Sequence, residues 1–482
     1  MKEQSFKEPP FLLSLLPVLV LVVLLFVTIR IFGADALSGG NQIILLTASA
    51  VCCMIAIFYS KIKWAVIENT IAGNIFGVTP AIFILLIIGA LSGTWMISGI
   101  VPTFIYYGIQ IIHPSFYLVS TCIICAVVSV MIGSSWTTIA TIGVALLGIG
   151  QVQGFSPGWI AGAIISGAYF GDKISPLSDT TILASSVTDT PLFTHIRYMM
   201  ITTIPSMIIT LIIFTIAGLS YNATATEQIT LYTESLKQTF NISAWLLIIP
   251  AVTFFMIIKK VPAIITLFAS AMMAGIAAVI AQPHLLHEIS GLETSGIASQ
   301  FKGFLMIFYG STSVETGSAE LNSLVSTNGM AGMMNTVWLI ICAMAFGGAM
   351  TAGGMLKSIT SAFIHLVKRT VTMVASTVGC GFFLTLTTAD QYIAIVLTGN
   401  MFKDIYKKQG YESRLLSRTT EDAVTVISPL VPWNTCGMTQ ATILGVPTFV
   451  YLPYCFFNLI SPLMSITISA IGYKIFKTKP RD

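Results

Sequence analysis

Long apolar runs divide this chain, and short polar or charged stretches separate them. The runs are about 20 residues long or longer, which is the length a helix needs to cross the hydrocarbon core of a bilayer. The pattern therefore predicts membrane-spanning helices rather than one soluble core. The eight clear spans are Phe11–Phe32, Gln42–Tyr59, Ala81–Ile112, Tyr198–Leu219, Ala244–Ile258, Ala263–Ala281, Val337–Leu366 and Thr448–Ile475.

Two further apolar regions, 116–147 and 373–401, are polar at their centres, with GSSWTT at Gly133–Thr138 and TTADQY at Thr387–Tyr392. The basic residues of the short loops decide how these regions cross the membrane, because such residues collect on the cytoplasmic side. The basic loops all fall inside when the N-terminus is cytoplasmic and both regions are re-entrant hairpins. This topology also places the C-terminus in the cytoplasm.

The two halves of the sequence resemble each other. The tetrapeptide ISPL occurs at Ile174–Leu177 and again at Ile427–Leu430, and Ser134 and Thr387 in the polar centres are also 253 residues apart. In the topology above, the repeated unit begins inside in one half and outside in the other. Inverted repeats with broken helices that meet near the bilayer midplane are typical of secondary transporters.

We therefore expect an all-α polytopic membrane protein with about ten spans, two re-entrant hairpins and two broken helices. The expected organisation is a first inverted repeat at 1–219 with its hairpin at 115–150 and broken helix at 158–190, an external linker at 220–241, and a second inverted repeat at 242–482 with its hairpin at 371–402 and broken helix at 419–446.

Composition supports this class and excludes others. Of the 482 residues, 55% are hydrophobic and only 9% are charged, against roughly 25% charged in soluble domains. The net charge of +4 comes with no basic patch interleaved with aromatic residues, so no nucleic-acid partner is expected. An intramembrane aspartyl protease would need a GxGD motif, and Tyr169 stands where its first glycine is required. We expect no enzyme activity.

The stretch GDKISPLSDTT, at Gly171–Thr181, concentrates polar groups inside this apolar sequence. Pro176 breaks a helix and frees carbonyl groups, which a cation can bind. Hydroxyls and carboxylates nearby complete the kind of oxygen cage that a hard cation such as sodium prefers. We expect sodium at Asp172 and Asp179. The oxygen ligands expected from this stretch are Asp172, Ser175, Ser178, Asp179 and Thr180.

The second copy, SPLVPWNTCG at Ser428–Gly437, breaks its helix with Pro429 and Pro432 and offers neutral oxygens in place of charge. Intramembrane carboxylates are costly and by default mark a transport or proton pathway. A carboxylate that binds either a proton or sodium, combined with alternating access, exchanges the two ions. The ligands expected from the hairpins and the second break are Ser134, Thr137, Asp390, Asn434 and Thr435.

The same residues also have structural interpretations, without a role in transport. Lys173 either pairs with a neighbouring Asp or serves as a counter-charge for an anionic substrate. Each Asp of the first stretch could cap a helix at the break, and Asp390 could be a purely structural partner. Glu421 and Asp422 follow a basic segment, which favours a solvated helix face.

The stretch Phe170–Ala184 resembles the characteristic FGDK-SPLSDTTNLA pattern of the NhaC-type sodium/proton antiporter family in the ion transporter superfamily, with Ile182 in place of an Asn oxygen ligand. TTADQYIAIV and SPLVPWNTCG are similar to its second-half motifs. The resemblance implies sodium/proton exchange in a bacterial plasma membrane by a homodimer, with no cofactor beyond the transported ions. Relatives that exchange malate and protons for lactate and sodium share these motifs, so a small carboxylate substrate is the alternative.

Overall fold

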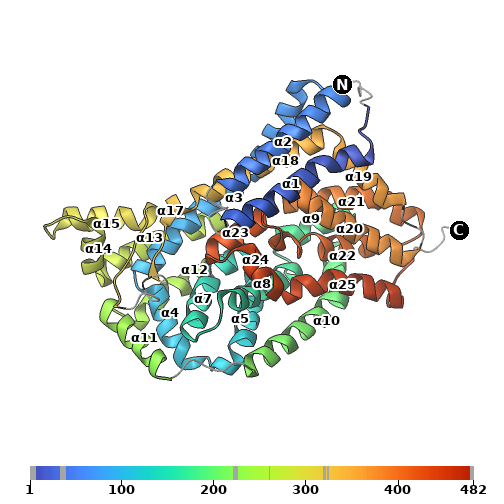
Figure 1. Cartoon of the computed structure of the whole chain (residues 1–482). Coiled ribbons are helices and arrows are strands. Elements are labelled where there is room, and N and C mark those ends of the chain that lie inside the picture. Colours follow the sequence, from blue (N-terminus) through green and yellow to red (C-terminus); the bar gives the residue numbers. More distant parts are fainter. Residues whose placement is uncertain are drawn as a thin grey trace.

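The computed structural model describes residues 7–32, 39–220, 226–259, 261–317, 322, 325–365, 367 and 369–477. Apart from two isolated β-bridges, these residues form helices and their connections (Figure 1). Nine of the described helices are long and apolar enough to cross a membrane, or eleven if two bent helix pairs each count as one span. The predicted all-α, multi-span architecture is confirmed. Both chain ends and part of the predicted linker, 221–225, lie outside the described residues.

The described α-helices follow one another along the chain, most of them with short connections. Their bounds are α1 (Phe11–Phe32), α2 (Gly40–Met54), α3 (Trp64–Ile97), α4 (Ile100–Ile111), α5 (Tyr117–Ile132), α6 (Ser135–Thr138), α7 (Val144–Val152), α8 (Pro157–Ile174), α9 (Asp179–Val187), α10 (Leu192–Leu219), α11 (Thr226–Thr239), α12 (Ile248–Ile258), α13 (Ala263–Ala281), α14 (Pro283–Ser290), α15 (Ile297–Tyr309), α17 (Gly329–Gly332), α18 (Met334–Ala352), α19 (Met355–His365), α20 (Thr370–Thr388), α21 (Gln391–Lys408), α22 (Ser413–Ala423), α23 (Thr435–Leu444), α24 (Thr448–Tyr451) and α25 (Phe456–Ile471).

Several predicted spans differ from the helices observed. The span expected from Ala81 begins at Trp64, because α3 continues through Pro80 and through a stretch whose polar residues lower its hydropathy. The same predicted span ends at Gly99, where a φ of +87° turns the chain into α4. A matching break at Gly354, with a φ of +70°, separates α18 from α19. Helices α14 and α15 were not predicted, and they project at the left of Figure 1.

The first hairpin consists of α5 and the helical segment from α6 to α7. Its turn, called the first tip (Gly133–Ser135), needs glycine because Gly133 has a φ of +75°. At the opposite end, the Gln153 side chain donates a 2.8 Å hydrogen bond to the Ile112 carbonyl. The hairpin therefore begins and ends on the same side.

The second hairpin, α20 and α21, is built in the same way. Its turn, called the second tip (Ala389–Gln391), has a left-handed residue at Ala389, with a φ of +57°. The hydroxyls of Thr370 and Tyr411 hydrogen-bond at 2.5 Å where the hairpin begins and ends. Both legs again start on one side.

Close helix contact fixes α8 against α5. A Cβ atom on Gly167 would lie 2.1 Å from the Cys122 carbonyl oxygen, and one on Gly171 would lie 2.4 Å from the Ala126 carbonyl oxygen. Both residue pairs advance by four along their helices, so α5 and α8 run parallel. This packing brings the first tip beside the point where α8 ends.

Candidate functional site

The first tip contacts the first break, Ser175–Ser178, which separates α8 from α9. Asp172, near the end of α8, is buried, and its Oδ2 accepts hydrogen bonds from the Ser135 backbone N–H at 3.1 Å and from the Ser135 hydroxyl at 2.7 Å. Asp172 Oδ1 is buried and has no hydrogen-bond partner among the described residues. The carboxylate is thus held by one oxygen and free at the other.

The second tip contacts the second break, Val424–Asn434, which separates α22 from α23. Asp390 caps α21 by accepting a 2.9 Å hydrogen bond from the Ile393 backbone N–H. Its other carboxylate oxygen accepts a 3.4 Å hydrogen bond from the Thr435 hydroxyl. The Thr435 N–H donates to the Ala389 carbonyl at 2.8 Å. Asp390 therefore has a capping role as well as a place beside the break.

The helix caps of the two halves correspond at a constant spacing. Ser134 caps α6 and Asp390 caps α21, 256 residues later. Ser178 caps α9 and Asn434 caps α23, again 256 residues later. The caps pair the two breaks differently from the ISPL match, which has a spacing of 253. The inverted orientation of the two repeats stays a prediction.

A cavity of about 610 Å³ lies where the two tips and breaks meet. Among the described residues that line it, three are Asp and none is Lys, Arg or His. The Tyr392 hydroxyl, from the second half, donates a 2.7 Å hydrogen bond to Asp179 Oδ2, from the first. The predicted site residues that line the cavity are Ser134, Thr137, Asp172, Asp179, Thr180, Asp390 and Thr435.

The other three predicted oxygen ligands do not line this cavity. The Ser175 hydroxyl donates to the Val130 carbonyl at 2.8 Å, which ties the first break to the first hairpin. Ser178 accepts from the Thr181 N–H as a cap, and Asn434 bonds the Thr385 carbonyl and the Cys436 N–H. Their polar atoms satisfy backbone groups at the breaks.

The cavity also receives residues that sequence reasoning did not single out. Ser135, Trp136 and Gln391 line it from the tips, and Tyr392 lines it beside Gln391. All four residues belong to the polar centres GSSWTT and TTADQY. The sequence therefore predicted the right segments of the chain but did not single out these four residues. Ile182, which stands in place of a family Asn, does not line the cavity and is 45% exposed. The substitution therefore removes no oxygen from the cavity.

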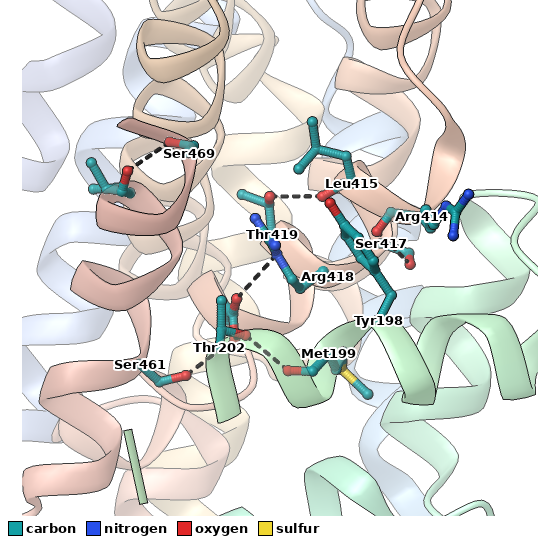
Figure 2. A network of polar contacts seen from close by, with 12 residues as sticks. Tyr198, Met199, Thr202, Arg414, Leu415, Ser417, Arg418, Thr419, Ser461 and Ser469 are labelled. Carbon is teal, nitrogen blue, oxygen red and sulfur yellow. Dashed lines mark hydrogen bonds and ion pairs between the residues drawn. The ribbon is translucent and has the colours of Figure 1, made fainter. Parts of the chain in front are cut away.

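Lys173 pairs with Asp422 of the second broken helix and not with a neighbouring Asp. Both side chains are fully buried. Asp422 Oδ1 also accepts hydrogen bonds from Ser461 at 3.1 Å and from Thr202 at 3.2 Å. Figure 2 shows Thr202, Ser461 and Arg418 grouped in this region, from α10, α25 and α22.

The predicted solvated face of Glu421 and Asp422 is wrong. Both residues and Arg418 have no exposed surface. Helix α22 packs among α9, α10, α20, α21 and α25, which cover it on several sides. The spacing of Arg418 and Asp422, one helical turn apart, was the only local signal of a buried pair, and the two groups lie 3.9 Å apart.

The chemistry of the cavity fits a hard monovalent cation more closely than a resident transition metal. The described residues contain no group of three or more His, Cys, Asp or Glu side chains placed to hold a metal ion. Residues with carboxylate and hydroxyl side chains instead line the cavity, and such oxygen donors suit hard cations. Binding of sodium at Asp172 and Asp179 stays a prediction.

These features define a class: a polytopic helical membrane protein whose two broken helices and two hairpin tips enclose an acidic cavity. The family model described as "Na+/H+ antiporter family" matches residues 167–473. The chain belongs to this family.

Two curated relatives and one solved structure are similar to this chain. The chain is 35% identical over 428 residues to the Na(+)/H(+) antiporter NhaC of Bacillus subtilis, covering 88% of this chain and 91% of the relative. It is 36% identical over 416 residues to the malate-2H(+)/Na(+)-lactate antiporter of the same organism, covering 86% of each. The YdaH transporter of Alcanivorax borkumensis matches with a TM-score of 0.39 and 11% identity, over 96% of this chain and 99% of that one.

Proposed function

We propose that the chain is a secondary active transporter that exchanges sodium for protons across the plasma membrane by alternating access. The observation that carries this proposal is the charge of the cavity, whose described lining includes Asp172, Asp179 and Asp390 and no basic side chain. A carboxylate that binds a proton cannot hold sodium at the same time. Sodium arriving from one side therefore displaces a proton, and the reverse occurs on the other side.

Exchange of malate and protons for lactate and sodium is the second candidate, and the relative of that name supports it. A carboxylate substrate needs a cationic or strongly donating partner in the cavity. Lys173, the candidate counter-charge, is buried against Asp422 and does not line the cavity. The geometry therefore favours the inorganic cation.

Topology and assembly complete the proposal. The distribution of basic loops supports cytoplasmic positions for both termini, and the family resemblance supports a homodimer in the plasma membrane. We expect no cofactor apart from the transported sodium ions and protons, and no enzyme activity.

Transport by the purified protein in proteoliposomes, with a pH-sensitive dye trapped inside, tests the function. A sodium gradient imposed without any organic acid should move protons in the opposite direction. Proton movement that requires malate or lactate would overturn the proposal in favour of the second candidate.

The site is tested by Asp172→Asn and Asp179→Asn, each of which should abolish exchange in folded protein. Asp189→Asn is the matched control, because the Asp189 side chain is 71% exposed and forms an ion pair with Lys403 at 2.5 Å. Sodium-dependent exchange at the wild-type rate in both cavity variants would overturn the site assignment.

A further inference from the structure

Glu421 is a fully buried carboxylate outside the cavity that the proposed exchange does not use. Its Oε1 accepts a 3.3 Å hydrogen bond from the Thr180 hydroxyl. Its Oε2 is buried and has no hydrogen-bond partner among the described residues. Among the described residues, the Glu421 side chain therefore has one hydrogen bond, at Oε1, and one oxygen without a hydrogen-bond partner, Oε2.

Thr180 connects this carboxylate to the cavity. Thr180 lines the cavity, and its hydroxyl hydrogen-bonds both Ser178 at 3.0 Å and Glu421 at 3.3 Å. A hydroxyl can accept a proton on its oxygen from a hydronium ion in the cavity, which becomes water, while it passes its own proton to Glu421. The transfer leaves Thr180 neutral and adds one proton to the carboxylate, and the reverse transfer returns it.

The neighbouring Asp422 has a different environment. Asp422 pairs with Lys173 and lies 3.9 Å from the Arg418 guanidinium. Glu421 forms no ion pair in the part of the chain that the structure describes. Because an isolated buried charge costs much more than a neutral group, burial favours the neutral, protonated form of Glu421, whereas Asp422 has the Lys173 ammonium as its counter-charge.

Several charged or titratable groups surround Glu421. Asp172 and Lys173, both on α8, interact electrostatically with the Glu421 carboxyl group. Other charged or titratable groups on packed elements have contacts of their own: Asp179 on α9 with Tyr392, Arg418 with Asp422 on α22, His195 with Ser417 and Tyr198 with Lys474 on α10, and Tyr406 with Thr377 on α21. Because Lys173 is already paired with Asp422, the deprotonated form of Glu421 has no ion-pair partner of its own among the described residues.

We propose that Glu421 is a further proton-binding residue of the exchanger, filled and emptied from the cavity through the Thr180 hydroxyl. This inference rests on the proposed sodium/proton exchange. In this proposal Glu421 binds a proton and does not contact sodium. A substitution of Glu421 should therefore impair proton transport without impairing sodium binding.

The variant Glu421→Gln keeps the shape of the side chain and cannot carry a proton. In proteoliposomes it should lower sodium-driven proton movement about tenfold or more. Exchange of labelled for unlabelled sodium, which moves no net proton, should stay within about threefold of wild type. Asp172→Asn, in contrast, should lose both activities. A purely structural role for Glu421 would lower both activities together and would overturn the proposal.

Thr180→Val and Thr180→Ser test the connection without altering the carboxylate. Thr180→Val should slow proton-coupled transport more than sodium–sodium exchange, and Thr180→Ser should restore it. These variants also decide the question if Glu421→Gln does not fold. Wild-type proton transport with an unchanged pH profile in Glu421→Gln and Thr180→Val overturns this inference alone. Absence of sodium-driven proton movement in the wild-type protein overturns the proposed function instead.

Discussion

Lys173 and Asp422 form a buried ion pair that joins the first broken helix to the second. Lys173 lies two residues before the first break, and its Nζ also donates a 3.0 Å hydrogen bond to Ser461. Thr202 donates to Asp422 from α10. The pair therefore ties together four helices beneath the cavity, and its two members depend on each other for charge balance.

Asp422→Asn should destabilise the protein by about 3–5 kcal/mol, because it leaves the Lys173 ammonium buried without its counter-charge. Thermal unfolding in detergent measures the effect. The matched control is again Asp189→Asn, which breaks the exposed pair with Lys403 and should cost less than about 1 kcal/mol.

The double variant Lys173→Met, Asp422→Leu separates charge from packing. Replacing a whole buried pair by apolar residues is often close to neutral, so the double variant should recover most of the stability that Asp422→Asn loses. Equal losses for Asp422→Asn and Asp189→Asn would show that the buried pair contributes no more than a surface pair.

Gly167→Ala should separate α8 from α5 and inactivate transport. The added methyl group would lie 2.1 Å from the Cys122 carbonyl oxygen, which backbone movement alone can relieve. We expect a lower unfolding temperature and loss of exchange. Gly73→Ala in α3 is the control, since its methyl group meets nothing within 4 Å and alanine is the better helix former by about 1 kcal/mol. Wild-type stability of Gly167→Ala would contradict the close packing.

The sequence predicted the tips and breaks because their signals are local. Polar clusters and prolines inside apolar runs are expensive in a membrane and persist where they line a cavity or meet protein. Asp172, Asp179 and Asp390 were named on this ground, and all three line the cavity. The start of α3 was missed because Glu68 and Asn69 lower the hydropathy of a segment that is nevertheless helical.

The buried pair could not be predicted, because its cause is long-range packing. Asp422 and Lys173 are 249 residues apart, and α22 taken alone has the charge of a solvated helix. Only its contacts with α10 and α25 bury it. The ISPL match and the helix caps align the two halves differently: the match has a spacing of 253 residues, whereas the caps Ser178 and Asn434 are 256 residues apart.

Ser135→Ala should weaken sodium binding while leaving the fold intact. The Ser135 hydroxyl holds Asp172 in its orientation toward the cavity with a 2.7 Å hydrogen bond, and hydrogen bonds to charged groups contribute about 1.5–3 kcal/mol. The sodium concentration for half-maximal exchange should rise about tenfold. Ser156→Ala, at an exposed helix start without a side-chain cap bond, should behave as wild type. An unchanged sodium dependence in Ser135→Ala would show that this hydrogen bond does not position the carboxylate for sodium.

Two cavities make it possible to test which end of the protein faces the cytoplasm. One turn of α3 separates them, since Ile84 lines the first and Ile88 lines a second cavity of about 330 Å³. Val261, beside the basic Lys259 loop, lines the first cavity, and Asn328 lines the second. On the proposed topology, which rests on the positive-inside rule, we expect the first cavity to face the cytoplasm.

An impermeant maleimide should therefore label Val261→Cys in inside-out vesicles and Asn328→Cys in right-side-out vesicles. The background is a variant without Cys53, which is partly exposed, and without Cys436, which lines the first cavity, because the other native cysteines are buried. Reversed labelling would invert the proposed topology. Labelling of both positions from the same side would show that the two cavities open to the same side of the membrane. Alternating access between these cavities would then be wrong.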